Sequence, residues 1–341
     1  MGNLILVMAG RMKHTILKIV SGTIFITIPV IYSAALGQSL GTWSISAPAP
    51  TKRTEVAVAA IGKKIYVAGG FGRLGVTSRV EEYDITTNRW REVSPMPRRL
   101  HHAGIGVVNG KLYVIGGFGG TFSWTPSNAI YEYDPVTNRW KTRSPMPTAR
   151  GALAVGIHQG KLYAIGGYAN GRNVSANEWY DPQENRWESR APLPTARDHL
   201  AVAVVGGTLF AIGGRLKSSY ARNLDTHETY DIKKNQWIKK PRLPTPRSGI
   251  AAATLRGKIF IFGGEAPNGT FNLNEAYDPR TEQWTTMTPM PTSRHGLGAT
   301  VIGDSIYVIG GGPKPGGSFS NVNEVFTLPD QQPPGRLKKN N

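Results

Sequence analysis

A diglycine that ends a short apolar run recurs six times in this chain. One copy is Lys161-Leu-Tyr-Ala-Ile-Gly-Gly167, and the first glycines of the six copies stand at positions 69, 116, 166, 213, 263 and 310. Their spacings are 47, 50, 47, 50 and 47 residues. β-Branched and aromatic residues before two glycines are typical of a buried strand. A fixed period of this length predicts a propeller, a solenoid or another repeat array.

A tryptophan and an aromatic–Asp pair keep the same phase as the diglycine. The tryptophans are Trp43, Trp90, Trp140, Trp187, Trp237 and Trp284. Five Tyr-Asp pairs, from Tyr83-Asp84 to Tyr277-Asp278, each place the Asp six residues before a tryptophan, and Phe326 replaces the tyrosine in the last unit. Each unit therefore predicts four strands, a to d, joined by tight turns. In the third unit we expect strand a at 152–157 and strand b at 161–165.

Diglycine, Tyr-Asp and Trp at a period near 50 resemble the kelch repeat over residues 42–328. The resemblance implies an all-β, six-bladed propeller with four antiparallel strands per blade. Because the first tryptophan precedes the first diglycine, Trp43 is expected to supply strand d to the last blade, which leaves no open sheet edge. The expected blades are about 51–97, 98–147, 148–194, 195–244, 245–291, and 292–328 together with 41–48.

The two ends of the chain lie outside the repeats. Three basic residues precede an apolar run over 19–36, and Ala35-Leu36-Gly37 has the small-x-small pattern of a cleavage site. This layout predicts a signal peptide over 1–37, export to the periplasm or the extracellular space, and a propeller over 38–330. The alternative is an uncleaved membrane anchor formed by residues 19–36. The basic, polar residues 331–341 predict a disordered tail.

Composition narrows the possible chemistry. The 341 residues include no cysteine, which excludes disulfides, thiolate metal sites and a cysteine nucleophile. A formal net charge of +18 favours an anionic partner. Gly70-Phe-Gly-Arg-Leu-Gly75 fits a dinucleotide-binding pattern, but no helix is expected to follow it. We expect a monomeric propeller without a cofactor, a metal or a nucleic-acid partner.

An arginine stands ten residues after five of the six tryptophans, and a glutamate stands two residues before five of the six strand-c aromatics. The exceptions, Leu100 and Tyr131, belong to the same unit. The arginine and the glutamate are thus lost together in one unit. This predicts that they form an ion pair within each of the other five blades, because a lone buried charge is strongly destabilising. The alternative is a ring of cations that binds an anion at the channel mouth. The expected pairs are Arg53–Glu81, Arg150–Glu178, Arg197–Glu228, Arg247–Glu275 and Arg294–Glu324.

Residues that differ between the units are more informative about function. Four histidines stand one or two residues after the arginine positions, at His101, His102, His199 and His295. Such a cluster could bind a metal or move protons, whereas the interpretation we favour at this point is that the channel mouth is solvated and tolerates polar residues. Aromatic and arginine side chains on the b–c loops are typical anchors of a protein or sugar site. These loop residues are Arg73, Phe118, Trp124, Tyr168, Arg172, Arg215, Tyr220, Arg222 and Glu265.

Together these features predict an exported, non-enzymatic propeller that binds a protein or a glycan, possibly anionic, through its b–c and d–a loops. The alternative is a carbohydrate enzyme, because bacterial N-acetylneuraminate epimerases are also exported six-bladed kelch proteins. In that case Arg215 or Arg172 would bind the sugar carboxylate. Glu265 or His295 would then act as the acid or base.

Overall fold

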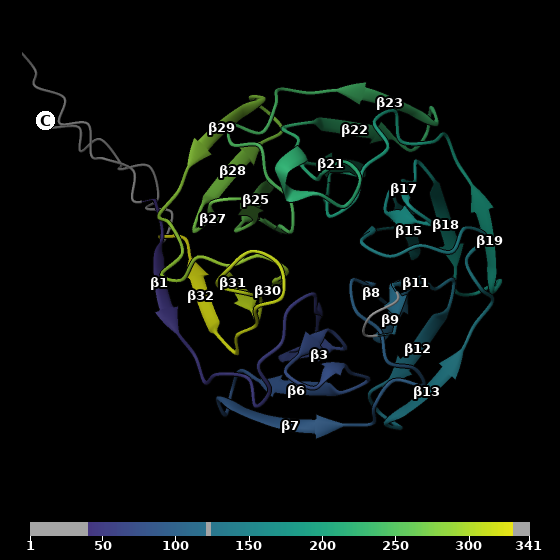
Figure 1. The fold of residues 1–341 in the computed structure, drawn as a ribbon, viewed down its shortest axis with the longest axis vertical. Helices are drawn as coiled ribbons and strands as arrows, with labels where there is room; N and C mark the ends of the chain where they lie inside the picture. The colour runs from purple at the N-terminus through teal and green to yellow at the C-terminus, as the bar shows by residue number, and fades with distance from the viewer. Residues whose placement is uncertain (1–39, 121–123, 330–341) are drawn as a thin grey trace, which may run out of the picture. The chain divides into compact units, whose positions relative to one another are not determined.

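Six four-stranded antiparallel sheets surround a common axis (Figure 1). The structure is a computed structural model and describes residues 40–120 and 124–329. The innermost strands of neighbouring sheets, such as β2 (Ala57–Ile61) and β8 (Gly104–Val108), contact each other around the axis. The all-β, six-bladed propeller predicted from the repeats is confirmed.

The first three blades follow one another along the chain. Blade 1 comprises β2, β3 (Lys64–Ala68), β6 (Val80–Asp84) and β7 (Arg89–Val93). Blade 2 comprises β8, β9 (Lys111–Ile115), β12 (Ile130–Asp134) and β13 (Arg139–Thr142). Blade 3 comprises β14 (Ala154–His158), β15 (Lys161–Ile165), β18 (Asn177–Asp181) and β19 (Arg186–Ser189). Strand a of this blade begins at Ala154 and not at residue 152, because Ala152 has a left-handed φ of 52°.

The remaining blades repeat this order, and the last one borrows a strand from the start of the propeller. Blade 4 comprises β20 (Ala201–Val205), β21 (Thr208–Ile212), β22 (His227–Asp231) and β23 (Gln236–Lys239). Blade 5 comprises β24 (Ala251–Leu255), β25 (Lys258–Phe262), β28 (Asn274–Asp278) and β29 (Gln283–Thr286). Blade 6 comprises β30 (Gly298–Ile302), β31 (Ser305–Ile309), β32 (Asn323–Thr327) and β1 (Thr42–Ile45).

Strand β1 closes the ring as predicted. It pairs antiparallel with β32, and Trp43 lies opposite Phe326 (Figure 1). The two rings pack at a centroid distance of 5.1 Å, and the Trp43 indole N–H donates to the Thr288 carbonyl of blade 5 at 2.9 Å. Each of the six blades therefore has its fourth strand.

The b–c loops contain short elements that the repeat pattern did not predict. Four of them form two-residue hairpins, and the loop of blade 4 forms a 3₁₀ turn, η1 (Tyr220–Arg222). The hairpin strands are β4 (Phe71–Gly72), β5 (Gly75–Val76), β10 (Phe118–Gly119), β11 (Thr125–Pro126), β16 (Tyr168–Ala169), β17 (Arg172–Asn173), β26 (Glu265–Ala266) and β27 (Gly269–Thr270). Their side chains lie at one end of the channel.

The repeated arginines are buried and lie in contact with the predicted glutamates. Arg150 has no solvent exposure, and its guanidinium lies 2.6 Å from the Glu178 carboxylate. It also donates to the carbonyls of Gly166 and Ala164, both at 2.8 Å. The same pairing holds in the other four blades: Arg53–Glu81, Arg197–Glu228, Arg247–Glu275 and Arg294–Glu324. In blade 2, Leu100 and Tyr131 are instead members of one hydrophobic cluster.

The diglycine has a second role, which is to join neighbouring blades. The Gly117 N–H donates to the Arg150 carbonyl of the next blade at 2.9 Å. A Cβ atom on Gly116 would lie only 2.6 Å from that same oxygen. Equivalent hydrogen bonds connect the other five pairs of neighbouring blades. The absence of side chains therefore serves the contact between blades, and it also leaves room for the buried arginine, since a Cβ atom on Gly167 would lie 3.3 Å from Arg150 Cδ.

The segments expected to be a signal peptide or anchor (1–37) and a disordered tail (331–341) lie outside the described residues. Export therefore stays a prediction. In residues 40–120 and 124–329, no helix has the length and apolar character needed to cross a lipid bilayer.

The buried ion pair leads to a test by double mutation. We expect Arg150→Met to lower the free energy of unfolding by about 3–5 kcal/mol, because it leaves the Glu178 carboxylate buried without its partner. Arg150→Met combined with Glu178→Leu should cost less, since blade 2 folds with an apolar pair at these positions. Denaturant unfolding of the two variants measures the difference. Equal losses of stability in the two variants would show that Arg150 and Glu178 do not stabilise the fold as a pair.

Candidate functional site

A closed ring of six backbone hydrogen bonds surrounds the channel at the loop end. Each bond joins equivalent residues of neighbouring blades, at distances of 2.7–3.1 Å. All six residues have left-handed backbone conformations, with φ between 52° and 65°. The members are Glu55, His102, Ala152, His199, Gly249 and Gly296.

Three members of this ring carry polar side chains in spite of their conformation. A left-handed φ costs a residue other than glycine about 1–2 kcal/mol. Glycine, which does not have this cost, occupies two of the six positions, so the fold does not require a side chain at them. Strained non-glycine residues gather at functional sites, and Glu55, His102 and His199 are therefore the first candidates for function in this structure.

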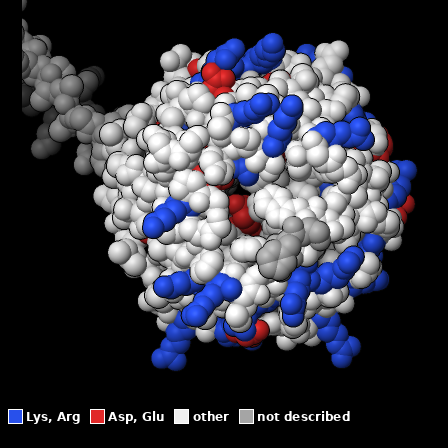
Figure 2. Space-filling model, in the orientation of Figure 1, with Lys and Arg blue, Asp and Glu red and all other residues white. Residues whose placement is uncertain are grey.

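A cavity of about 290 Å³ lies over the ring and opens toward the loops. Three aromatic side chains line it, from Phe71, Trp124 and Tyr220. Polar side chains line the remainder, among them Thr54, Glu55, His102, Arg215, Glu265 and His295. Figure 2 shows acidic side chains in the hollow at the centre of this face, with Lys and Arg nearer its rim.

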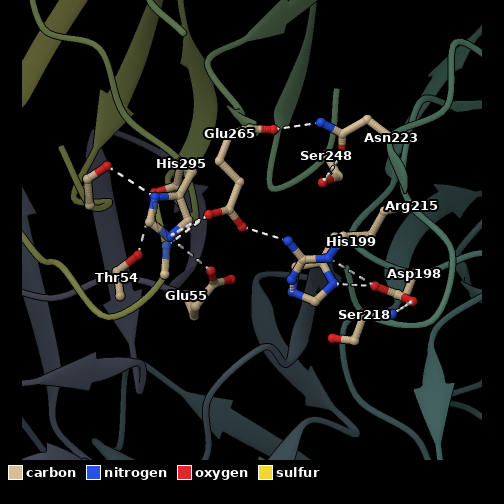
Figure 3. A network of polar contacts seen from close by, with 12 residues as sticks. Thr54, Glu55, Asp198, His199, Arg215, Ser218, Asn223, Ser248, Glu265 and His295 are labelled. Carbon is tan, nitrogen blue, oxygen red and sulfur yellow. Dashed lines mark hydrogen bonds and ion pairs between the residues drawn. The ribbon is translucent and has the colours of Figure 1, made fainter. Parts of the chain in front are cut away.

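Arg215 is held by acidic partners inside the site (Figure 3). Its guanidinium lies 2.6 Å from Glu265 Oε1 and 3.3 Å from Asp198 Oδ1. It also donates to His199 Nε2 at 2.7 Å. Asp198 accepts a second hydrogen bond from His199 Nδ1, at 2.5 Å. The positive charge of Arg215 is therefore neutralised within the protein.

His295 faces two carboxyl groups. Its Nδ1 lies 3.1 Å from the Gly312 carbonyl, which can only accept, so Nδ1 carries the proton of the neutral ring. Its Nε2 lies 3.6 Å from Glu265 Oε2 and 3.7 Å from Glu55 Oε1 (Figure 3). A lone pair of the imidazole thus faces the carboxyl oxygens of two other blades.

Glu55 connects this side of the site to the paired histidines of blade 2. Its Oε2 lies 3.2 Å from His102 Nε2, while the Nδ1 atoms of His102 and His101 share a hydrogen bond of 2.5 Å. Gly296 gives the carboxyl group its room, since a Cβ atom there would lie 2.5 Å from Glu55 Oε1. Glu55 therefore touches residues of blades 2 and 6 at once.

Burial shifts the protonation of these groups. Burial, reinforced by the charge of Glu265, raises the pKa of Glu55 to about 8. Burial also holds the pKa of His102 and His199 below the usual range, and in His199 the nearby charge of Arg215 adds to this effect. Burial alone would raise the pKa of Asp198, but the hydrogen bond from His199 and the charge of Arg215 outweigh it and keep that pKa low. At neutral pH the imidazoles are uncharged.

Comparison with known proteins agrees with this architecture. The KLHDC2/KLHL20/DRC7 Kelch-repeats domain matches residues 33–167, 92–240 and 141–311, which together span well over half of the chain. The chain belongs to the kelch-repeat family. Its strands a to d, diglycines and Tyr-Asp pairs are therefore those of kelch blades.

Two individual proteins resemble this kelch propeller. The F-box/kelch-repeat protein At5g26960 of Arabidopsis thaliana is 43% identical over 54 residues, which are 16% of this chain and 13% of that protein. The solved structure of YjhT superposes with a TM-score of 0.74 and 18% identity, and covers 85% of this chain and 99% of that one. At this identity the likeness to YjhT is one of fold.

The kelch fold brings together only part of the residues predicted as a binding face. His101, His102, Trp124, Arg215, Tyr220, Glu265 and His295 line the cavity, and His199 contacts Arg215 at its edge. Arg73, Arg172 and Arg222 are exposed, Tyr168 is half-buried, and Phe118 is buried against Trp124 and His101. These five are not among the residues that line the cavity.

The expectation of a solvated channel mouth is wrong. His101 and His295 are each 1% exposed, His199 is 5% exposed, and Asp198 has no exposure. The sequence places these residues on different blades, but six blades converge on one narrow channel and the loop hairpins cover it. Residues far apart in the chain are therefore packed against each other.

Two central residues were not selected from the sequence. Glu55 occupies the same kelch position as His102 and His199, so the phase of the repeat could have identified it. Asp198 stands beside His199 in the chain, where it orients that imidazole. Neither has a signal of its own, because a single acidic residue in a loop is common.

The room that Gly296 leaves for Glu55 can be tested against a matched glycine. We expect Gly296→Ala to lower the free energy of unfolding by about 1 kcal/mol more than Gly249→Ala. Both changes place alanine at a left-handed φ, at 58° and 65°, but a Cβ atom at 249 meets no atom closer than 3.3 Å. Denaturant unfolding gives both values. A Gly249→Ala loss as large as that of Gly296→Ala would refute the steric role.

Proposed function

We propose that this kelch propeller binds an uncharged monosaccharide, or the end of a glycan, in the cavity over the channel. The observation that supports this proposal is the lining of the cavity, where aromatic rings and a dense set of hydrogen-bonding groups face the same space. A concave site with a few converging polar groups is the usual form of a small-molecule site. Kelch propellers generally mediate protein interactions, and the volume of about 290 Å³ favours a small ligand for this cavity.

The aromatic wall suits the apolar face of a sugar ring. Trp124 is 43% exposed and packs against Phe118 at a centroid distance of 5.3 Å, so its ring is braced on one side. Tyr220 lies 5.9 Å from the Arg215 guanidinium. Aromatic rings bury much apolar surface while the polar groups around them bind hydroxyls.

The charge of the site favours a neutral ligand over a sugar acid. Arg215 is the one Lys or Arg among the described residues that line the cavity, and it is bound to Asp198 and Glu265. Arg172, the other arginine considered for a sugar carboxylate, is exposed and is not among the lining residues. A ligand carboxylate would therefore enter beside Glu55 and Glu265 without a free cation to meet it.

Anomer exchange is a second candidate, favoured by one observation. Glu265 is 2% exposed and lines the cavity, so its carboxylate is positioned at the ligand. Burial would raise its pKa, but the charge of Arg215 and the hydrogen bond that the Gly316 N–H donates to its carboxylate help to hold that pKa below its usual range. The group is therefore ionised at neutral pH, as a general base must be.

Saturation-transfer NMR against a panel of neutral monosaccharides, amino sugars and sugar acids tests the proposal. We expect at least one neutral sugar to bind, and Trp124→Ala to weaken the binding of that sugar about fivefold, because stacking on one aromatic ring contributes about 1 kcal/mol. Tyr168→Ala, which changes another loop aromatic that is not among the lining residues, is the matched control and should leave the affinity unchanged.

The outcomes separate the candidates. Binding that is lost equally in Trp124→Ala and Tyr168→Ala, or no binding by any neutral sugar, contradicts a site in this cavity. If the wild type speeds the exchange between the α and β anomers of a sugar more than Glu265→Gln does, the protein is an enzyme rather than a binding module.

A further inference from the structure

Glu55, His102 and His199 bring one possible ligand atom each close together at the channel. The three donor atoms lie within 4.8 Å of one another. Each residue comes from a different blade and occupies the same ring position, and each has a left-handed backbone conformation. Glycine or alanine fills the other three positions. The strained positions that carry long side chains are thus the ones that converge.

Both imidazoles are held as metal ligands usually are. In His199, Nδ1 faces the buried Asp198 carboxylate at 2.5 Å, so it carries the proton and Nε2 keeps its lone pair. In His102, Nδ1 is bonded to His101 Nδ1, and Nε2 points to Glu55. A histidine that ligates a metal typically donates its other ring N–H to a carboxylate or another acceptor, which fixes the tautomer and the ring.

We propose that Glu55, His102 and His199 form a site for a divalent transition-metal ion such as Zn²⁺, Fe²⁺ or Co²⁺. Two imidazoles and a carboxylate select such ions over Mg²⁺ and Ca²⁺, which prefer oxygen ligands. In a tetrahedral site with bonds of about 2.1 Å, donor atoms stand about 3.4 Å apart. The His102–Glu55 contact of 3.2 Å is already at this spacing.

The surroundings of the site accommodate a cation. Arg215 now donates to His199 Nε2, and on giving up that contact it keeps its ion pairs with Glu265 and Asp198. The remaining oxygen of Glu55 faces the lone pair of His295 Nε2 at 3.7 Å, which makes His295 a neighbouring donor. Glu55 and His102 also line the cavity, so the metal would have coordination positions open to a ligand or to water.

Uptake of Co²⁺ by the full chain, after treatment with a chelator, tests the proposal. We expect about one Co²⁺ per chain, with visible d–d absorption bands that Zn²⁺ abolishes by displacement. Glu55→Gly, His102→Gly and His199→Gly should each weaken binding at least about a hundredfold, since each removes a ligand of a three-ligand site. These variants suit the fold, because glycine already occupies this ring position in two blades.

His158→Ala is the matched control, because His158 ends β14 far from the channel mouth. It should bind Co²⁺ like the wild type. If a glycine variant unfolds more easily than the wild type in chelator, Glu55→Gln provides the test, since it keeps the size of the side chain. No stoichiometric Co²⁺ uptake, or variants that bind as tightly as His158→Ala, would overturn the proposal. The measurement uses no carbohydrate, so its failure and the failure of sugar binding are separate results.

Discussion

The ring of backbone hydrogen bonds around the channel is the interaction on which the arrangement of the site depends. It joins residues of all six blades, and each bond links one blade to the next. Because every member must adopt a left-handed conformation, the ring fixes both the position and the direction of any side chain that it carries. A glutamate on blade 1 and histidines on blades 2 and 4 meet only because this geometry is repeated. The site therefore depends on a backbone geometry that all six blades share, and it forms at the ring positions where the residue type differs between blades.

The structure separates repeated charges from those that serve the site. The buried arginines lie between strands and bond to glutamates and carbonyls of their own blade, so they are part of the framework. Arg215 has a different environment, because it lies among Asp198 and His199 of its own blade and Glu265 of the next blade. The excess of positive charge in the chain thus says little about this cavity, whose centre is acidic (Figure 2).

The sequence predicted the framework better than the site, for a physical reason. Diglycines and tryptophans recur six times and Tyr-Asp pairs five times, and repetition makes a weak local signal strong. The place of Trp43 in strand d of the last blade followed from counting the repeats alone. The site depends on contacts such as Glu55 with His295, which join residues 240 positions apart and have no local pattern. The burial of His101 and Asp198 likewise arises from the convergence of blades and from the loop hairpins, which the sequence did not reveal.

Closure by β1 has a consequence for the order of events during synthesis. Among the described strands β1 is made first and its partner β32 is made last, and its contact at Thr288 lies 245 residues after Trp43. Contacts between distant segments form slowly, whereas each blade can pair its own neighbouring strands as it is made. The hydrogen bond between Glu55 and Gly296 crosses the same seam. The site therefore matures only when the seam closes, and a local opening there would disconnect Glu55 from His295 while five blades stay folded.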